Sequence, residues 1–255
     1  RGENVFAGGF LGLDNIAVVD RSAVEAAGAR LEQADATGWM ALFALSMTEM
    51  AFELAQDEPV YVELAKHFLG RFVAIGDALA RLGGQGLWDP EEQFFFDQLR
   101  HPDGTTLRLK AFSIVGLVPL FAARVTEAGL LEELPAFARH LEELAREHPS
   151  FFGPCQCFLS PNERGQRLVA LVDEHRLRPI LDRVLDETRF LSPYGVRSLS
   201  RRHAELEFPV DVDLGTRRVR VTYEPGEART RIKGGNSNWR GPVWFPINYL
   251  LVQAL

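Results

Sequence analysis

The chain has 255 residues, of which 46% are hydrophobic, and a formal net charge of -7. This length and composition allow one domain that buries roughly three-quarters of its unfolded surface. No basic segment is concentrated enough to follow a phosphate backbone, and no apolar run reaches the roughly 20 residues of a membrane-spanning helix. Nucleic acid and membrane partners are therefore not expected.

The only cysteines, Cys155 and Cys157, are one residue apart. They are too few for a disulfide framework and lack neighbours that would complete a zinc site. They are interpreted as ordinary thiols in a reducing, cytoplasmic compartment. The sequence predicts neither a metal site nor a cofactor.

The N-terminal segment Gly8–Ile16 surrounds one carboxylate, Asp14, with glycines and apolar residues. Glycine lets the backbone approach a ligand closely, and an aspartate in apolar surroundings retains a proton for general acid catalysis. An Asx turn or a helix cap is the alternative interpretation of Asp14.

Two long helices are expected next. The first begins with Asp35 or Thr37 as its N-cap and carries an apolar face at helical spacing, formed by Trp39, Leu42, Phe43, Met47, Met50, Ala51 and Leu54. The second follows Asp57–Pro59, ends at Gly83-Gly84, and has on one face Val62, Ala65, Leu69, Phe72, Gly76, Leu79 and Leu82. The short connection predicts an antiparallel hairpin.

Residues 84–110 predict a β-hairpin-like excursion, with a turn at Pro102–Gly104. Trp88 and Asp89 at its start again place an aromatic ring beside a carboxylate. Helices are then expected at Ser113–Glu127, 130–144 and Pro179–Thr188, separated by a loop at 149–158 and a weakly patterned stretch at 162–174. A turn-rich segment, Ser192–Ser200, precedes an exposed loop at 201–233. This order favours an all-α fold, either an α/α toroid or barrel or a plain helical array.

The segment Gly234–Trp244 combines turn residues with two tryptophans, one arginine and several Asn and Ser side chains. A tryptophan face can stack on the C–H face of a sugar, and Arg, Asn and Ser can hydrogen-bond its hydroxyls. The alternative is a buried loop held by its own aromatics. The apolar helix that follows, 248–255, has no cap and needs a cover. We therefore expect residues 1–255 to form a single but partial domain of a larger protein, truncated at both ends.

Five motifs in order resemble glycoside hydrolase family 63, in particular its bacterial glucosidase and mannosylglycerate hydrolase-like branch. They are Phe10–Asn15, Leu31–Asp35, Gly86–Asp89, Ser192–Gly195 and Gly235–Pro242, and the likeness covers essentially the whole chain. The resemblance implies an (α/α)6 barrel, incomplete here, and inverting hydrolysis of an α-linked glucoside or related glycoside. The segment Glu92–Phe96 departs from the family pattern, which leaves sugar contacts there in doubt.

The resemblance also implies roles for individual residues. Asp14 would be the general acid, and the general base would follow Leu255, with Glu224 and Glu227 as alternatives within the chain. Sugar platforms or pocket walls would be Trp39, Trp88, Trp239 and Trp244, and hydroxyl ligands would be Glu32, Asp35, Asp89, Asn238 and Arg240. The expected partner is an oligosaccharide or small glycoside. The alternative is a non-catalytic carbohydrate-binding or scaffold module of the same fold, and the oligomeric state stays open.

Overall fold

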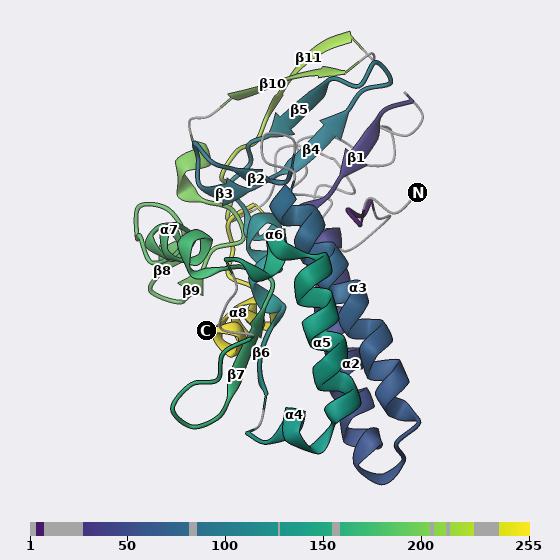
Figure 1. Cartoon of the computed structure of the whole chain (residues 1–255). Helices are drawn as coiled ribbons and strands as arrows, with labels where there is room; N and C mark the ends of the chain where they lie inside the picture. Colours follow the sequence, from purple (N-terminus) through teal and green to yellow (C-terminus); the bar gives the residue numbers. More distant parts are fainter. Residues whose placement is uncertain are drawn as a thin grey trace.

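The computed structural model describes residues 4–7, 28–81, 86–126, 128–154, 159–204, 207–212, 215–226 and 240–255. In these ranges seven α-helices accompany several small antiparallel sheets (Figure 1). The expectation of an all-α fold was therefore wrong in part, because residues predicted as helix or loop form strands. No closure of the helices into a barrel is seen in the described ranges.

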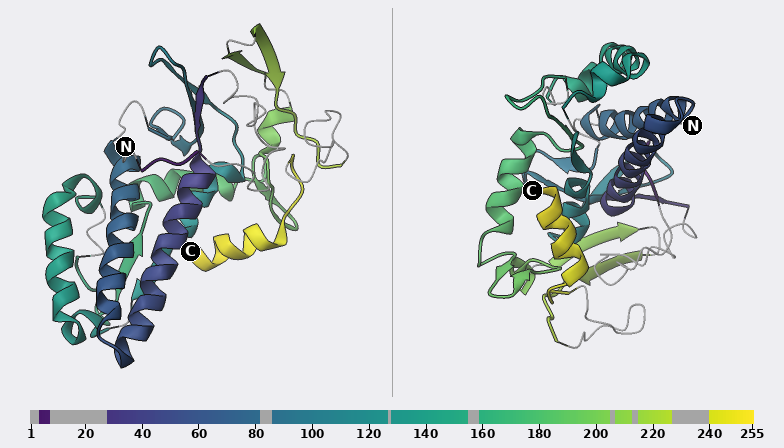
Figure 2. Two further views of the ribbon diagram at one scale, coloured as in Figure 1. Left: turned by 90° about the vertical axis from the view of Figure 1, so that its right-hand side faces the viewer. Right: turned by 90° about the horizontal axis from the view of Figure 1, so that it is seen from below.

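The predicted helical hairpin is confirmed. Helices α2 (Ala34–Asp57) and α3 (Tyr61–Arg81) lie side by side and are joined by three residues, as Figures 1 and 2 show. Helix α5 (Pro135–Glu147) packs along α3, between the short helices α4 (Leu130–Glu133) and α6 (Pro149–Phe152). One helix was predicted over 130–144, but it is interrupted at Leu134 before Pro135.

The predicted excursion at 84–110 is also confirmed, and it joins an earlier strand. Strands β1 (Arg30–Glu32), β4 (Asp97–Arg100) and β5 (Thr106–Leu109) form a three-stranded antiparallel sheet in the order β1-β4-β5. Strands β2 (Trp88–Asp89) and β3 (Phe94–Phe95) form a short ribbon beside it. The pairing of β1 with β4 joins the two ends of the α2–α3 hairpin.

The predicted N-cap of α2 was wrong. The helix starts at Ala34, so its N-cap is Gln33, whose side chain makes no capping hydrogen bond. The carboxylate of Asp97, on β4, instead accepts a hydrogen bond from the Ala34 N–H at 2.9 Å. Sequence spacing favours a local cap, whereas this cap comes from a strand 63 residues away.

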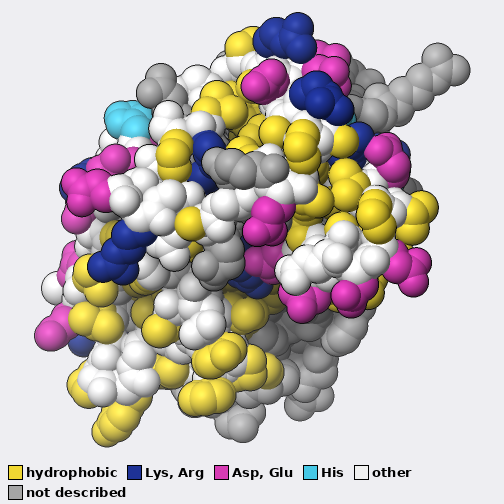
Figure 3. Space-filling model, turned by 60° about the horizontal axis from the view of Figure 1, so that its bottom comes forward, with side chains coloured by type: hydrophobic (Ala, Val, Ile, Leu, Met, Phe, Trp, Pro, Cys, Tyr) yellow, Lys and Arg dark blue, Asp and Glu magenta, His cyan; other side chains and the backbone are white. Residues whose placement is uncertain are grey.

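The apolar face predicted for α2 was wrong in part, since Ala51 is buried and Trp39 and Leu42 pack against the core but other members are exposed, whereas that of α3 is buried as predicted through Leu79. The buried face of α2 consists mainly of small residues, Ala41, Ala44, Leu45, Thr48, Ala51 and Ala55. Large side chains of the predicted face reach the surface, since Phe43 and Met50 are both 55% exposed. Hydrophobic side chains likewise lie exposed among acidic ones on the lower face of the molecule (Figure 3). Small residues let α2 approach its neighbours more closely than the large ones would.

The centre of the core is η2 (Ile114–Phe121), a fully buried 3-10 helix that contacts both α2 and α8 (Phe245–Ala254). An α-helix was predicted over Ser113–Glu127. Pro119 lacks the N–H that an α-helix would use, and the residues that follow form β6 (Ala123–Thr126), paired with β7 (Arg167–Ala170). The apolar composition of the segment therefore predicted its burial correctly, but the segment forms a 3-10 helix and a strand in place of the predicted α-helix.

The remaining elements differ from the prediction in position. Helix α7 spans Glu174–Val184, starting earlier than expected because the Asp173 carboxylate accepts a hydrogen bond from the Arg176 N–H. Strands β8 (Leu191–Ser192) and β9 (Gly195–Val196) form the predicted turn. The predicted loop at 201–233 was wrong in part, because it contains η4 (Arg201–Ala204) and the paired strands β10 (Glu207–Val212) and β11 (Gly215–Arg220). Alternating Val, Phe and Thr favour such strands.

Candidate functional site

The first group of predicted site residues lies where β1 passes into α2. Glu32 is 2% exposed and accepts hydrogen bonds from both neighbouring side chains of β4, Gln98 at 3.0 Å and Arg100 at 2.8 Å. Asp35 is fully buried in the first turn of α2, where the helix dipole favours a negative charge, and it accepts a hydrogen bond from the Ala36 N–H. Both carboxylates are therefore held in fixed positions.

Trp39 lies one turn further along α2 and is half-buried against Phe121 of η2, with 5.7 Å between the ring centroids. The preceding residue explains this close contact. A Cβ atom on Gly38 would lie 2.7 Å from the backbone nitrogen of Pro119. Glycine thus lets η2 reach the backbone of α2 and brings the Trp39 ring onto the core.

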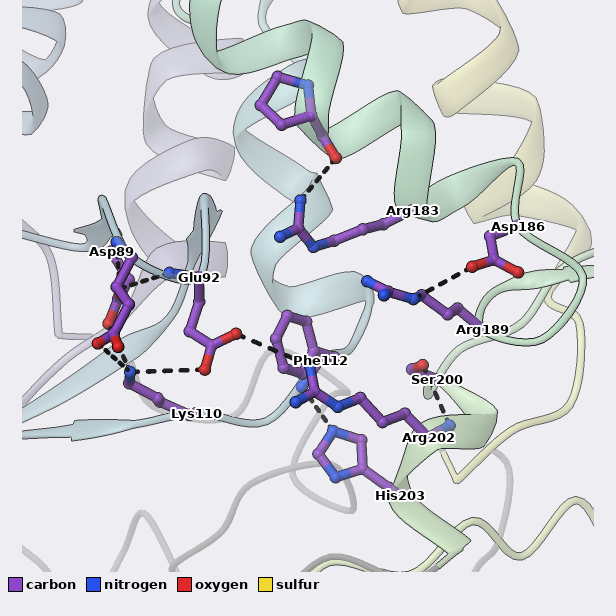
Figure 4. Close-up of polar contacts among 12 residues, drawn as sticks. Asp89, Glu92, Lys110, Phe112, Arg183, Asp186, Arg189, Ser200, Arg202 and His203 are labelled. Atoms are coloured by element: carbon purple, nitrogen blue, oxygen red, sulfur yellow. Dashed lines mark hydrogen bonds and ion pairs between the residues drawn. The ribbon is translucent and has the colours of Figure 1, made fainter.

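Trp88 and Asp89, on β2, lie in different environments. The half-buried Trp88 ring contacts Phe95 edge-on at 4.9 Å, and the Arg176 guanidinium lies 5.8 Å from its centroid. Asp89 is 4% exposed and lies 3.2 Å from both Arg108 and Lys110 (Lys110 is drawn in Figure 4). Part of the Trp88 surface is therefore already covered by protein, and Asp89 belongs to a buried ionic network.

The hydrogen bonds of Asp89 outweigh its burial. Burial alone would raise the pKa of this carboxyl, but hydrogen bonds from the Glu92 N–H, Lys110 and Arg108 lower the pKa below its usual value. Asp89 is consequently a carboxylate at neutral pH and can only accept hydrogen bonds.

Arg240 is the most unusual of the predicted site residues. It is 1% exposed, yet its Nε and Nη1 atoms are buried without a hydrogen-bond partner among the described residues. Burial lowers its pKa, and the charge of Glu224 opposes this effect. The Glu224 N–H also donates to the Arg240 carbonyl at 2.7 Å. A buried guanidinium with unused donors is costly unless a ligand completes its hydrogen bonds.

The turn that follows Arg240 is tied to the predicted Ser192–Ser200 segment. The Gly241 N–H donates to Ser198 Oγ at 2.9 Å, and the Ser198 N–H donates to the Pro242 carbonyl at 3.0 Å. Gly241 has φ +131, and a Cβ atom there would lie 2.3 Å from the Tyr223 ring. Only glycine fits this position, so the ring of Tyr223 covers the turn directly.

Trp244 is half-buried and immediately precedes α8. The Asn248 side chain, one turn into α8, holds this region together. Its Nδ2 donates to the Trp244 and Val196 carbonyls, and its Oδ1 accepts a hydrogen bond from the Val196 N–H at 2.7 Å. The two motifs that contain Gly195 and Gly241 therefore form one unit.

The structure thus unites some predicted site residues and leaves others untested. Glu32, Asp35 and Trp39 lie at the end of β1 and the start of α2, whereas Arg240 and Trp244 come just before α8, and η2 contacts both helices. Residues outside the described ranges are Asp14, Cys155, Cys157, Glu227, Asn238 and Trp239. Their predicted roles stay predictions.

Several side chains that fix this arrangement were not assigned a role from the sequence. They are Asp97, Gln98, Arg100, Arg108, Lys110, Tyr223 and Asn248. A signal existed for two pairs with a spacing of two residues, which places side chains on one face of extended backbone. Gln98 and Arg100 both lie in β4, whereas Lys110 directly follows the end of β5, which contains Arg108. Nothing local indicated which carboxylate each pair would meet.

The described ranges offer neither a cluster of metal ligands nor a membrane-spanning helix. No group of three or more His, Cys, Asp or Glu side chains among those residues could hold a metal ion. None of the described helices combines the length and the apolar composition needed to cross a membrane.

Comparison with known proteins gives a partial match to a probable glucosidase. No family model matches the chain. Over 83 residues, 32% of its length, the chain is 34% identical to a probable mannosyl-oligosaccharide glucosidase of Schizosaccharomyces pombe, covering 7% of that protein. The chain is therefore similar in part to a glucosidase.

A second relative matches the whole chain. The uncharacterized protein YMR196W of Saccharomyces cerevisiae is 40% identical over 268 residues, which cover 100% of this chain and 24% of the yeast protein. The chain thus spans about a quarter or less of the length of either relative.

Proposed function

We propose that this chain is part of an inverting α-glycosidase related to glycoside hydrolase family 63, with its helices belonging to an (α/α)6 barrel. The observation that carries the proposal is the setting of Arg240 in the Trp-Arg-Gly motif, a buried guanidinium with two donor atoms that no described residue satisfies. A sugar hydroxyl would supply the missing acceptors. The partial similarity to a probable glucosidase supports the same class.

The proposed roles follow from the chemistry of inversion. Asp14 would protonate the leaving oxygen, and a second carboxylate roughly 6.5–9.5 Å away would activate water. We propose that this base lies in a longer protein, outside these 255 residues. Glu224, the alternative within the described ranges, fits the role less well, because it is 8% exposed and its charge already stabilises the Arg240 guanidinium.

The substrate-binding residues proposed are Glu32, Asp35, Trp39, Trp88, Asp89, Asn238, Trp239, Arg240 and Trp244. The fixed hydrogen bonds of the described carboxylates suit them to accept bonds from hydroxyl groups or to position residues that do. Their partner would be an oligosaccharide or small glycoside.

The test is an NMR assay of the product anomer, using the longer protein and a panel of α-glucosides. We expect β-glucose as the first product. Asp14→Asn should lower kcat at least roughly 100-fold, and less for substrates with good leaving groups, which need little protonation. Asp57→Asn, at the exposed end of α2, is the control and should leave kcat unchanged.

Two outcomes would contradict the proposal. Formation of the α-anomer would exclude inversion. Sugar binding without turnover of any substrate would favour the alternative, a non-catalytic carbohydrate-binding module.

A further inference from the structure

Five arginines gather between the end of α7 and η4, in a chain whose net charge is -7. This arginine cluster consists of Arg183, Arg189, Arg197, Arg201 and Arg202. Figure 4 shows Arg183, Arg189 and Arg202 extending toward a common region from α7, from the segment after it and from η4. None of the five belongs to the substrate-binding set proposed above.

A cavity of about 410 Å³ lies elsewhere, beside α2, but the one next to the arginine cluster is larger, at about 810 Å³. Its lining consists of Glu187, Thr188, Leu191, Pro193, Arg197, Arg201, Arg202 and Ala204. Three guanidinium groups thus face one carboxylate. The local charge is positive, opposite in sign to that of the chain.

Two of these arginines are held in place by neighbouring groups. Arg197 donates from Nε to the Tyr223 hydroxyl at 3.1 Å and from Nη1 to the Leu191 carbonyl. The Arg202 guanidinium lies 5.0 Å from the centroid of the Phe112 ring. Such anchoring reduces the entropy that these side chains would lose when a ligand binds.

The cluster holds more positive than negative charge, although Arg189 is paired with Asp186 at 3.1 Å. Arg202 lies 3.7 Å from a Glu92 oxygen, but Glu92 is also 3.7 Å from Lys110. The Arg201 side chain makes no hydrogen bond or ion pair with any residue in the described ranges. Burial lowers the pKa of nearby Arg183, and the charges of Arg189 and Arg202 lower it further against the opposing effect of Glu92. An anion would relieve this repulsion.

The geometry favours a particular anion. Guanidinium groups donate in forked pairs that match the oxygens of a phosphate. The cavity is much larger than a phosphate, so it has room for the molecule that carries one. We propose that the arginine-lined cavity binds the phosphate group of a small soluble molecule. This proposal does not rest on the glycosidase assignment.

Calorimetric titration of the 255-residue chain tests the proposal. The probes are inorganic phosphate, glucose 6-phosphate and glucose, at constant ionic strength set with chloride. We expect saturable binding of a phosphate-bearing probe that depends on the arginine cluster, whereas any binding of glucose alone, at the candidate sugar site, should not depend on it. The Arg201→Gln/Arg202→Gln variant should bind about tenfold or more weakly, because it loses two charge-assisted donors.

Two further variants separate the cavity from general charge effects. Arg178→Gln removes an arginine that is 75% exposed and paired with Glu174 on α7, and it should bind as the wild type does. Glu187→Gln removes the opposing carboxylate and should strengthen phosphate binding. Circular dichroism checks that each variant is folded.

Each result bears on the proposal. Binding of glucose 6-phosphate but not inorganic phosphate, weakened in the double variant, would support it and show that the carrier adds contacts. Absence of binding by both phosphate probes would overturn it. Equal binding by the wild type and Arg201→Gln/Arg202→Gln, or equal weakening by Arg178→Gln, would also overturn it.

Discussion

Arg240 and His203 are both buried ionisable side chains, with 1% and 0% exposure. Burial lowers the pKa of each, because the interior disfavours a positive charge. The guanidinium of Arg240 nevertheless stays charged, whereas His203 is neutral at pH 7. The two residues therefore affect stability in different ways.

For Arg240, function and stability should separate. The variant Arg240→Met/Glu224→Gln removes the buried charge and the charge opposite it, and it should be at least as stable as the wild type. Sugar binding should fall, because the unused donors are lost. Chemical unfolding and sugar titration measure the two effects, with Arg178→Met as the control. A loss of more than about 2 kcal/mol in unfolding free energy would show instead that Arg240 is structural.

His203 should make stability depend on pH. Its Nε2 accepts a hydrogen bond from the Phe112 N–H at 2.8 Å, and burial, followed by the charge of Arg202, lowers its pKa from 6.5 to about 4. Because the pKa of His203 is lower in the folded than in the unfolded chain, the neutral imidazole contributes to stability. This contribution is complete above pH 6.5 and is lost as the pH falls toward about 4. The expected loss at about pH 4.5 is about 2.5 kcal/mol.

The variant His203→Gln keeps an acceptor for Phe112 but cannot titrate. Urea unfolding should show the wild type losing about 2.5 kcal/mol relative to this variant between about pH 7 and about pH 4.5. His175→Gln, at an exposed position, is the control and should follow the wild type. Parallel pH profiles for the wild type and His203→Gln would contradict the assignment.

At the scale of elements, the contact between α2 and η2 depends on one glycine. Gly38→Ala would place a Cβ atom 2.7 Å from the backbone of Pro119 and should cost roughly 1–3 kcal/mol of unfolding free energy. Gly70→Ala, within α3, meets no atom within 4 Å and should add roughly 0.5–1 kcal/mol. Thermal or urea unfolding measures both. Similar effects of the two substitutions on the unfolding free energy would mean that α2 and η2 can move apart without loss of stability.

The exposed apolar face of α2 leads to a second prediction at this scale. Phe43→Gln/Met50→Gln changes two side chains that are each 55% exposed, so stability should change by less than about 1 kcal/mol, while binding of a hydrophobic dye falls. Leu45→Ala, at a 3% exposed position, should cost roughly 2–5 kcal/mol. A large loss of stability in the first variant would place its side chains in the core.

The contrast between α2 and α3 shows what sequence periodicity can reveal. In α3 the large residues Leu69, Phe72 and Leu79 share one face, so size and burial agree. In α2 the closest core contact requires small residues, and Phe43, Met50 and Leu54 were therefore wrongly assigned to the buried face. Periodicity identified both helices, but which face is buried depended on how closely the neighbouring elements approach.

The same limit applies to the candidate site. The motif around Arg240 was recognisable from its unusual mixture of residue types. The burial of Arg240 and its nearness to Glu224 arise only in the folded chain. The partners of Glu32 come from β4, across 66 residues, and no local pattern connects them.

At the scale of the whole molecule, long-range pairings hold the elements together. The sheet β1-β4-β5 joins segments on either side of the α2–α3 hairpin, and η2 contacts both α2 and the C-terminal α8. A fold with many such contacts forms more slowly than one built from local contacts. The predicted (α/α)6 barrel stays a proposal for the longer protein.

The α2–α3 hairpin also has the properties of a lever. Its base is fixed by the pairing of β1 with β4, and α5 packs along α3, so a change of angle at the base would carry α5 along with the hairpin. With about 1.5 Å per residue, α2 carries the tip about 36 Å from the base. A rotation of about 5° beside Glu32 would therefore displace the tip by about 3 Å. A fluorophore at Val60, which is 69% exposed at that tip, would convert small rearrangements near the candidate sugar site into a measurable signal.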